Sequence, residues 1–303
     1  MSESPSPTPS TQELVGDAAS RPAVVNTVAD LREAIAAVRA TDATIGLVPT
    51  MGALHRGHLS LVQRSRQRCD ATVVTIFVNP TQFAFEEDLD KYPRPLQQDL
   101  RLLAEEGVDL VFVPDEAEVY PEGFTTSINP PQVARMLEGE SRPTHFAGVA
   151  TVVLKLFNMV NADVAFFGQK DYQQSLVVRH LVADLNVPIE IDVCPIVRDE
   201  DGLALSSRNV YLSAEERKAA LSLNRTLAEA ASLIRQGEND GRVLAAQMTQ
   251  SLIEGGVTEL EYAVVADAET LQVQEMVHLP VVLLVAARVG TTRLIDNVLI
   301  REA

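Results

Sequence analysis

Two histidines three residues apart form the densest group of chemically useful side chains in the sequence. His55 and His58 lie in segment 51–58 (MGALHRGH), which follows a short apolar run and leads into a helical pattern. Residues three apart at a helix start share one face. Gly57 removes a side chain between them, so a ligand can approach the backbone closely. Two imidazoles beside the free amides of a helix start suit the charge that develops on a phosphate under attack.

Two other interpretations of the histidine pair remain open at this point. A lone His-x-x-His most often places two solvent-facing side chains on a turn. A zinc site is a weaker alternative, because a helical zinc pair needs a four-residue spacing with a glutamate, and no third ligand is evident.

A second group, GQKD at 168–171, follows an apolar strand pattern and opens a helix. The ammonium of Lys170 can bind phosphate oxygens. Asp171 can cap the helix, which is the default interpretation, or hold a ribose hydroxyl. Gln173 and Gln174 follow on the first helical turn, where most glutamines are merely exposed.

Three more polar stretches lie in predicted loops. Segment 205–209 (LSSRN) follows the acidic turn 199–202 (DEDG), and together they suit a mobile lid over a triphosphate or, equally well, a polar interdomain linker. Segments 78–83 (VNPTQF) and 142–146 (RPTHF) place amides, a cation and an imidazole among aromatic residues. Such a mixture suits a small polar substrate in a partly apolar pocket.

Several enzyme classes lack support. The sequence contains neither G-x-x-x-x-G-K-[ST] nor G-x-G-x-x-G, so a P-loop kinase or a standard NAD enzyme is not indicated. It also lacks the G-x-S-x-G elbow of serine hydrolases.

The elements that must position these groups alternate along the chain. We expect strands at 44–49, 71–78, 108–113, 163–167 and 188–193, and helices at 27–40, 57–69, 96–107, 148–160 and 172–185. Apolar strands alternating with helices indicate an α/β fold, a Rossmann-like parallel sheet with helices on both faces.

The pattern changes near residue 198. A long helix over 213–236 begins with a capping box at Ser213 and Glu216, and a second helix spans 241–253. Strands follow at 260–266, 281–287 and 293–298. We therefore predict a disordered tail at 1–22, a nucleotide-binding domain at 23–197 and a smaller α+β lid domain at 198–303.

The 303-residue chain is acidic, since 25 Lys and Arg against 42 Asp and Glu give a net charge of −17. Such a surface repels nucleic acid and anionic membranes, so neither is an expected partner, and a few local cations must hold any anionic ligand. No apolar run reaches the roughly 18 residues of a membrane span. The two cysteines, Cys69 and Cys194, are too few for a disulfide framework. We expect reduced thiols and a cytoplasmic location.

Taken in order, the polar segments resemble the pantothenate synthetase (pantoate–β-alanine ligase) family of the nucleotidyltransferase superfamily with a His-x-Gly-His motif. The matching segments are PTMGALHRGH (49–58), IFVNPTQF (76–83), RPTHFAGVATVVLKLF (142–157), FFGQKDYQQ (166–174) and GLALSSRN (202–209). A looser match continues through EYAVVAD (261–267) and ARVGTTRLIDN (287–297).

The resemblance implies a ligase that makes pantothenate in two steps. ATP, with Mg²⁺, and pantoate form pantoyl adenylate and pyrophosphate, and the amine of β-alanine then displaces AMP. It also implies a homodimer. Positioning of the substrates and electrostatic stabilisation of the transition state would supply much of the rate enhancement.

The resemblance also implies site residues. His55, His58 and Lys170 would be catalytic, with His58 the proton donor. The residues expected around ATP are Met51, Gly52, Ala53, Leu54, His55, Arg56, Gly57, His58, Gly168, Gln169, Lys170, Asp171, Val197, Leu205, Ser206, Ser207 and Arg208. Gln82 and Gln174 would bind pantoate, with Asn79 and Arg142 as further candidates around the same pocket.

Three departures from the family pattern stand out. Gln169 replaces a frequent glutamate, and Leu205 a frequent methionine. Related sequences carry adjacent aspartates where this chain has Gln98 and Asp99, so Asp99 is the remaining candidate for a magnesium ligand.

Three alternatives to this enzyme stay open. A different nucleotidyltransferase would keep the histidines and Lys170 but would have no reason to keep Gln82 and Gln174. A nucleotide sensor would bind ATP without releasing pyrophosphate. A purely structural protein is hardest to reconcile with five polar clusters on one predicted sheet edge.

Overall fold

The computed structural model describes residues 22–83, 89 and 92–302. The predicted tail at 1–22 lies outside the described residues except for Pro22, so the prediction of disorder stays untested.

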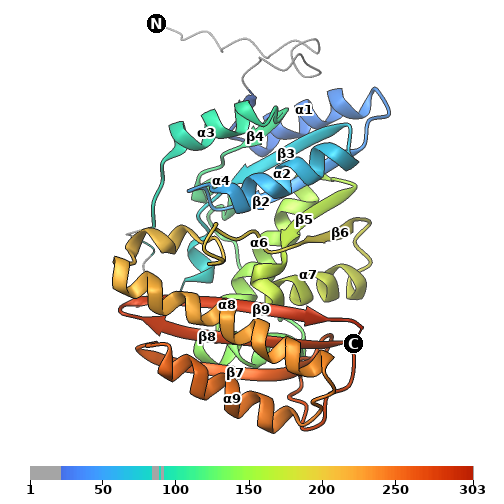
Figure 1. Cartoon of the computed structure of the whole chain (residues 1–303). Coiled ribbons are helices and arrows are strands. Elements are labelled where there is room, and N and C mark those ends of the chain that lie inside the picture. Colours follow the sequence, from blue (N-terminus) through green and yellow to red (C-terminus); the bar gives the residue numbers. More distant parts are fainter. Residues whose placement is uncertain (1–21, 84–88, 90–91, 303) are drawn as a thin grey trace, which may run out of the picture.

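The first part of the chain folds around a six-stranded sheet (Figure 1). Its strands are β1 (Ala23–Val25), β2 (Ile45–Thr50), β3 (Ala71–Ile76), β4 (Leu110–Phe112), β5 (Val164–Gly168) and β6 (Glu190–Cys194). They lie in the order β1-β4-β3-β2-β5-β6, and each neighbouring pair is parallel. The predicted α/β fold is confirmed. The sequence pattern does not predict β1, because three residues are too few to show a strand period.

The order of the strands creates a switch point between β2 and β5. Strands β3 and β4 lie on one side of β2, and the later strands β5 and β6 lie on its other side. In open α/β sheets, ligands bind outside the carboxyl ends of the strands at such a point. The segment with the two histidines follows β2 and the turn with Lys170 follows β5, so the topology brings the two predicted groups together.

Helices cover both faces of the parallel sheet. Side chains of α1 (Val28–Arg39), α6 (His145–Val160) and α7 (Tyr172–Asp184) share one core with the strands, and those of α2 (Arg56–Arg68) and α3 (Leu96–Glu105) share another. Strands buried on both sides show continuous apolar runs, and all six residues of β3 are buried.

Helix α6 begins at His145, three residues before the predicted start at Gly148. Gly148 suggests a helix boundary, but the residue lies inside the helix for a packing reason. A side-chain carbon at this position would lie 2.4 Å from the carbonyl oxygen of Thr81. The glycine therefore lets the helix lie directly against the turn that carries Gln82.

Short helical segments complete this part of the chain. They are η2 (Pro80–Gln82), α4 (Glu116–Val119), η4 (Gln132–Arg135), α5 (Glu138–Ser141) and η5 (Gln169–Asp171), and η6 (Ser207–Tyr211) follows later.

The last third forms a second sheet with two long helices. Helices α8 (Ala214–Arg235) and α9 (Gly241–Glu254) precede β7 (Glu259–Asp267), β8 (Val281–Val289) and β9 (Thr292–Ile300), which pair antiparallel in that order. The capping box at Ser213 and Glu216 forms as predicted. The predicted division at residue 197 stays a prediction.

Both faces of this smaller sheet are covered, and Figure 1 shows α8 lying along it. Leu283 and Val285 of β8 share a core with α8 and α9, whereas Val282 and Leu284 share one with α7. One side of the carboxyl-terminal sheet thus packs on the parallel-sheet part, beside the carboxyl end of β5.

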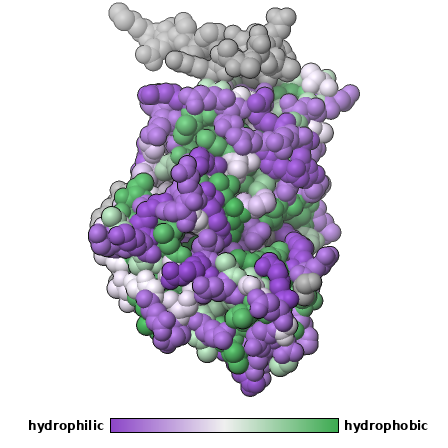
Figure 2. Space-filling model, in the orientation of Figure 1, coloured by the Kyte–Doolittle hydropathy of each residue, from purple (hydrophilic) through white to green (hydrophobic). Residues whose placement is uncertain are grey.

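The face in Figure 2 is mainly hydrophilic, with hydrophobic residues in small patches between polar ones. Across the part of the chain that the structure describes, no helix combines the length and the apolar character that a bilayer span requires.

Candidate active site

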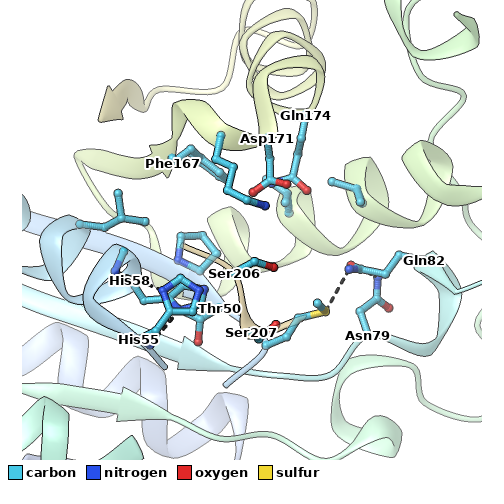
Figure 3. Close-up of a pocket in the computed structure, with 18 of the residues that line it drawn as sticks. Thr50, His55, His58, Asn79, Gln82, Phe167, Asp171, Gln174, Ser206 and Ser207 are labelled. Atoms are coloured by element: carbon cyan, nitrogen blue, oxygen red, sulfur yellow. Dashed lines mark hydrogen bonds between the residues drawn. The ribbon is translucent and has the colours of Figure 1, made fainter. Parts of the chain in front are cut away.

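A pocket of about 250 Å³ opens at the carboxyl ends of β2 and β5. Figure 3 shows His55 and His58 on one side of it, Asn79 and Gln82 on the other, and Asp171 and Gln174 projecting from the next wall. Its floor is partly apolar, with Phe77, Phe166 and several valines of α6. The pocket therefore combines an apolar surface with a few convergent polar groups, as small-molecule sites do.

The two histidines are held by the start of α2. The N–H of Gly57 donates to Nδ1 of His55 (3.1 Å), and the N–H of His55 donates to Nδ1 of His58 (3.3 Å). The arrangement is a capping box built from imidazoles, with ring centroids 4.1 Å apart. Because each Nδ1 accepts from an amide, each neutral ring carries its proton on Nε2. Each ring therefore keeps one N–H donor for a ligand.

Both histidines are neutral at physiological pH. Burial, reinforced by the charge of Lys170, lowers the pKa of His55 to about 4. Burial, with smaller contributions from His55 and Lys170, lowers the pKa of His58 to about 3. A bound polyanion would raise both pKa values, but the capping role of Nδ1 favours the neutral ring.

The loop before α2 is closed by Asp99. Its Oδ2 accepts the N–H of Ala53 (2.9 Å) and its Oδ1 accepts the N–H of Leu54 (2.8 Å). These amides belong to a loop in which Gly52 and Ala53 both have positive φ. Burial raises the pKa of the Asp99 carboxyl and the two amides oppose that shift.

This geometry gives no support to the expected magnesium role of Asp99. The side chain is only 1% exposed, it does not line the pocket, and both oxygens already serve the loop. Gly52, Ala53 and Leu54 likewise are not among the residues that line the pocket.

The turn η5 carries Lys170 and Asp171 into the pocket from the end of β5. Asp171 stands at the N-cap of α7, yet its side chain makes no capping hydrogen bond. The default capping interpretation is therefore wrong, and the carboxylate lines the pocket instead.

The two adjacent glutamines of α7 have different surroundings. Gln174 lines the pocket, whereas Gln173 is 3% exposed and lies in the core. The amide of Gln173 donates to the carbonyls of Val133 and Met136 (both 2.6 Å) and accepts the N–H of Glu138 (3.1 Å). Of the two glutamines, only Gln174 lines this pocket.

On the opposite wall, Gln82 is held by a small network. Nδ2 of Asn79 donates to its Oε1 (3.2 Å), and its own Nε2 donates to the sulfur of Met51 (3.0 Å). A thioether is a weak acceptor, so this amide group can readily turn to a better one. Asn79 is 1% exposed and its Oδ1 also accepts from Tyr120 (2.8 Å), so the contacts of Asn79 hold the turn in place.

Arg142 and His145 hold the same turn through its backbone. Nδ1 of His145 donates to the carbonyl of Gln82 (2.8 Å), and Nη2 of Arg142 donates to the same oxygen (3.2 Å). Since a carbonyl only accepts, His145 carries its proton on Nδ1, and its Nε2 accepts from Nη1 of Arg142 (3.2 Å). Both side chains also line the pocket.

The carboxyl-terminal sheet supports this wall from behind. Glu138 of α5 is 8% exposed and accepts from both terminal nitrogens of Arg293 on β9 (2.7 Å each) and from Tyr262 on β7 (2.6 Å). Burial would raise the pKa of Glu138, but the hydrogen bonds and charge of Arg293 outweigh it and lower that pKa.

The acidic segment 199–202, expected as part of a mobile lid or of a linker, forms a turn held by ion pairs. Arg198 pairs with Ala204 across a β-bridge and forms a bidentate pair with Asp296 (2.6 and 2.9 Å). Arg217 of α8 contacts Asp199 (2.8 Å) and Asp201 (2.7 Å). The acidic residues that suggested flexibility are thus the partners of nearby arginines, a contact that sequence spacing does not reveal.

Most of the predicted residues meet at the pocket. Those that line it are Met51, His55, Gly57, His58, Asn79, Gln82, Arg142, Gly168, Lys170, Asp171, Gln174, Val197, Leu205, Ser206, Ser207 and Arg208. Arg56 and Gln169 instead contact Asp199 (2.5 Å) and Asn297 (3.2 Å), outside the lining.

Several lining residues were not predicted as site residues. Thr50, Phe167, Pro195 and Ile196 lie at the ends of strands, where only the topology shows that they share an edge. His145 stands in a segment that the sequence singled out, and its spacing from Arg142 was the available signal.

The fold and the pocket define the class of protein: a Rossmann-like α/β protein whose cation-lined pocket lies at the switch point of a parallel sheet. Comparison with known proteins specifies it further. The sequence model of the pantoate-beta-alanine ligase family matches residues 23–299. The chain belongs to this family.

Relatives and solved structures agree with this assignment. The chain is 53% identical over 274 residues to the pantothenate synthetase of Roseiflexus sp., covering 90% of this chain and 98% of that protein. It is 49% identical over 277 residues to that of Acetivibrio thermocellus, covering 91% and 99%. A crystal structure of pantothenate synthetase from Thermus thermophilus superimposes with a TM-score of 0.88 at 44% identity, covering 92% and 100%.

A further solved structure is that of pantoate-beta-alanine ligase from Francisella tularensis, complexed with beta-gamma ATP and beta-alanine. It superimposes with a TM-score of 0.72 at 34% identity, covering 92% of this chain and 97% of that one.

Proposed function

We propose that this protein condenses pantoate with β-alanine at the expense of ATP, with pantoyl adenylate as the intermediate. The observation that carries the proposal is the meeting of two donor groups at one pocket. The histidines and Lys170 lie at the switch point, and the amides of Gln82 and Gln174 reach the pocket from other elements. The first group suits phosphates, and the second suits a small polar acid.

In the first step, an oxygen of the pantoate carboxylate attacks the α-phosphorus of ATP. The new oxygen–phosphorus bond forms as the bond to pyrophosphate breaks. Nε2–H of His55 and His58 and the ammonium of Lys170 stabilise the negative charge on the phosphates and the leaving group. Because the imidazoles are neutral, they act here as hydrogen-bond donors.

In the second step, the amine of β-alanine attacks the acyl carbon of the adenylate. The carbon–nitrogen bond forms, the bond from carbon to the phosphate oxygen breaks, and AMP leaves with that oxygen. The attacking nitrogen loses a proton to solvent water. Gln82 and Gln174 hold the pantoyl group in both steps, so the protein contributes mainly by positioning.

Magnesium enters as part of the substrate MgATP. Among residues 22–83, 89 and 92–302, no group of three or more His, Cys, Asp and Glu side chains is arranged to hold a metal ion. Magnesium usually keeps several waters and takes few protein ligands when it rides on phosphates. Asp171, whose carboxylate lines the pocket, is the side chain best placed to orient its water shell.

The remaining roles extend the same proposal. Met51, Val197, Leu205 and the segment 206–208 would enclose the nucleotide, with the two serines and Arg208 near the phosphates. We further propose a homodimer in the cytoplasm, with residues 198–303 as a lid domain that covers ATP.

Exchange of labelled pyrophosphate into ATP tests the proposal. Pantoate alone should support exchange, because the first step needs no amine. A nucleotide sensor would bind ATP and give no exchange, and another nucleotidyltransferase would require a different acid.

A further inference from the structure

The turn that carries Lys170 is held by a side chain from the other end of the chain. Nδ2 of Asn297, on β9, donates to the carbonyls of Gln169 and of Lys170 (both 3.0 Å). Its Oδ1 accepts from Nε2 of Gln169 (3.2 Å). One carboxamide thus contacts two consecutive peptide groups of η5, across 127 residues of sequence.

Asn297 is itself rigidly placed. It is 2% exposed, and its N–H donates to Oδ1 of Asp296 (2.8 Å). The Asp296 side chain, also 2% exposed, forms the bidentate pair with Arg198. Adjacent residues of one strand therefore hold two walls of the pocket: Asp296 holds the turn before Leu205, and Asn297 holds the turn with Lys170.

The ammonium of Lys170 depends on this backbone contact. Among the described residues, Lys170 takes part in no ion pair that would fix its long side chain. The position of the Lys170 ammonium in the pocket therefore depends on the position of its backbone. Asn297 donates hydrogen bonds to that backbone. Small shifts of a charged group relative to reacting atoms are costly, since about 1 Å of misplacement can lower a rate 10²-fold.

We propose that Asn297 is a positioning residue for Lys170. It sets the position of the lysine from the carboxyl-terminal sheet and does not itself line the active-site pocket. This inference rests on the proposed function, because it requires that Lys170 act on the phosphates.

A double-mutant cycle in the adenylate-forming step tests this coupling. With Lys170 present, Asn297→Ala should lower the single-turnover rate about 10- to 100-fold at saturating ATP and pantoate. In a Lys170→Ala background, the same change should have a much smaller effect, because the group that it positions is already gone. The affinity for pantoate should change little in either background.

Thr226→Val is the matched control. Thr226 is a buried residue of α8 whose hydroxyl donates to Ser251 (2.8 Å), within the same part of the chain and away from the pocket lining. It should lower the melting temperature as Asn297→Ala does and leave the single-turnover rate unchanged. If Asn297→Ala does not fold, Asn297→Ser carries the same cycle, since its hydroxyl can keep one of the two hydrogen bonds that Nδ2 of Asn297 donates.

The outcomes separate the two claims. If Lys170→Ala itself leaves the rate unchanged, the proposed role of Lys170 fails. Suppose instead that Lys170→Ala lowers the rate, but Asn297→Ala lowers it by the same factor in both backgrounds or in neither. Asn297 then does not act through Lys170, and the inference is overturned.

Discussion

Replacement of His55 can separate its two roles in the structure. The ring caps α2 through Nδ1, which accepts the N–H of Gly57 (3.1 Å), and it presents Nε2–H to the pocket. Asparagine is a strong N-cap residue and can accept the same amide hydrogen, whereas alanine cannot. His55→Asn should therefore keep the cap and lose the pocket donor, and His55→Ala should lose both.

The two losses have different magnitudes. Removal of an N-cap costs about 0.5–2 kcal/mol in the free energy of unfolding, or roughly 2–4 °C in melting temperature per kcal/mol for a chain of this size. Removal of one donor that stabilises transition-state charge costs about 10²–10³ in rate. His55→Asn should thus keep the melting temperature and form adenylate much more slowly. His55→Ala should lower both the melting temperature and the rate of adenylate formation.

Single-turnover adenylate formation and thermal unfolding, measured on the same preparations, give the comparison. Asp240→Ala is the matched control, because Asp240 caps α9 through the N–H groups of Arg242 and Val243, and no residue of that helix lines the pocket. It should lower the melting temperature and leave the rate unchanged. If His55→Asn formed adenylate at the unaltered rate, the ring would be a structural cap only, and the argument for phosphate contact would be refuted.

The remaining predictions concern the pKa values and the amides. The folded-state pKa values of His55 and His58, about 4 and about 3, lie below the ordinary 6.5, so their contribution to stability should be present above pH 6.5. It should be lost as pH falls from 6.5 towards 4 for His55 and towards 3 for His58. Assigned ring resonances of His55 or His58 that titrate near 6.5 in NMR spectra would contradict this. Gln82→Ala and Gln174→Ala should each weaken pantoate about 5- to 150-fold, since an unpaired partner costs about 1–3 kcal/mol, and should leave ATP binding nearly intact; equal losses for both ligands in calorimetry would reject the assignment. Gln173→Ala should instead lower the melting temperature, because the N–H of Glu138 and the carbonyl of Val133 lose a hydrogen bond at a buried position, and a thermally unchanged variant would count against that role.

Local sequence patterns were sufficient to predict most helices and strands and many of the residues that line the pocket. Apolar runs and helical spacing predicted the five main strands of the parallel sheet, and many residues of the motifs next to β2 and β5 line the pocket. This works because an open parallel sheet brings the carboxyl ends of its central strands together whatever the loop lengths are. His58 and Lys170, more than one hundred residues apart, are placed in one pocket by that rule alone.

Contacts between distant segments could not be predicted in the same way. The resemblance to the family suggested Asp99 as a magnesium ligand, but its oxygens close a loop 45 residues away. The roles of Asn297 and Asp296 also depend on how β9 lies against η5 and Arg198. Side-chain type indicates what a residue can bind, and only the packing of the two sheets shows which partner it has.

Pyrophosphate exchange is the most direct test of the central claim that this pocket makes an acyl adenylate. Labelled pyrophosphate should enter ATP when pantoate is present and β-alanine is absent, and exchange should stop when pantoate is omitted. Lys170→Ala should reduce exchange by about 10²–10³ at an unchanged melting temperature. Exchange that strictly requires β-alanine, or that proceeds without pantoate, would contradict the two-step account.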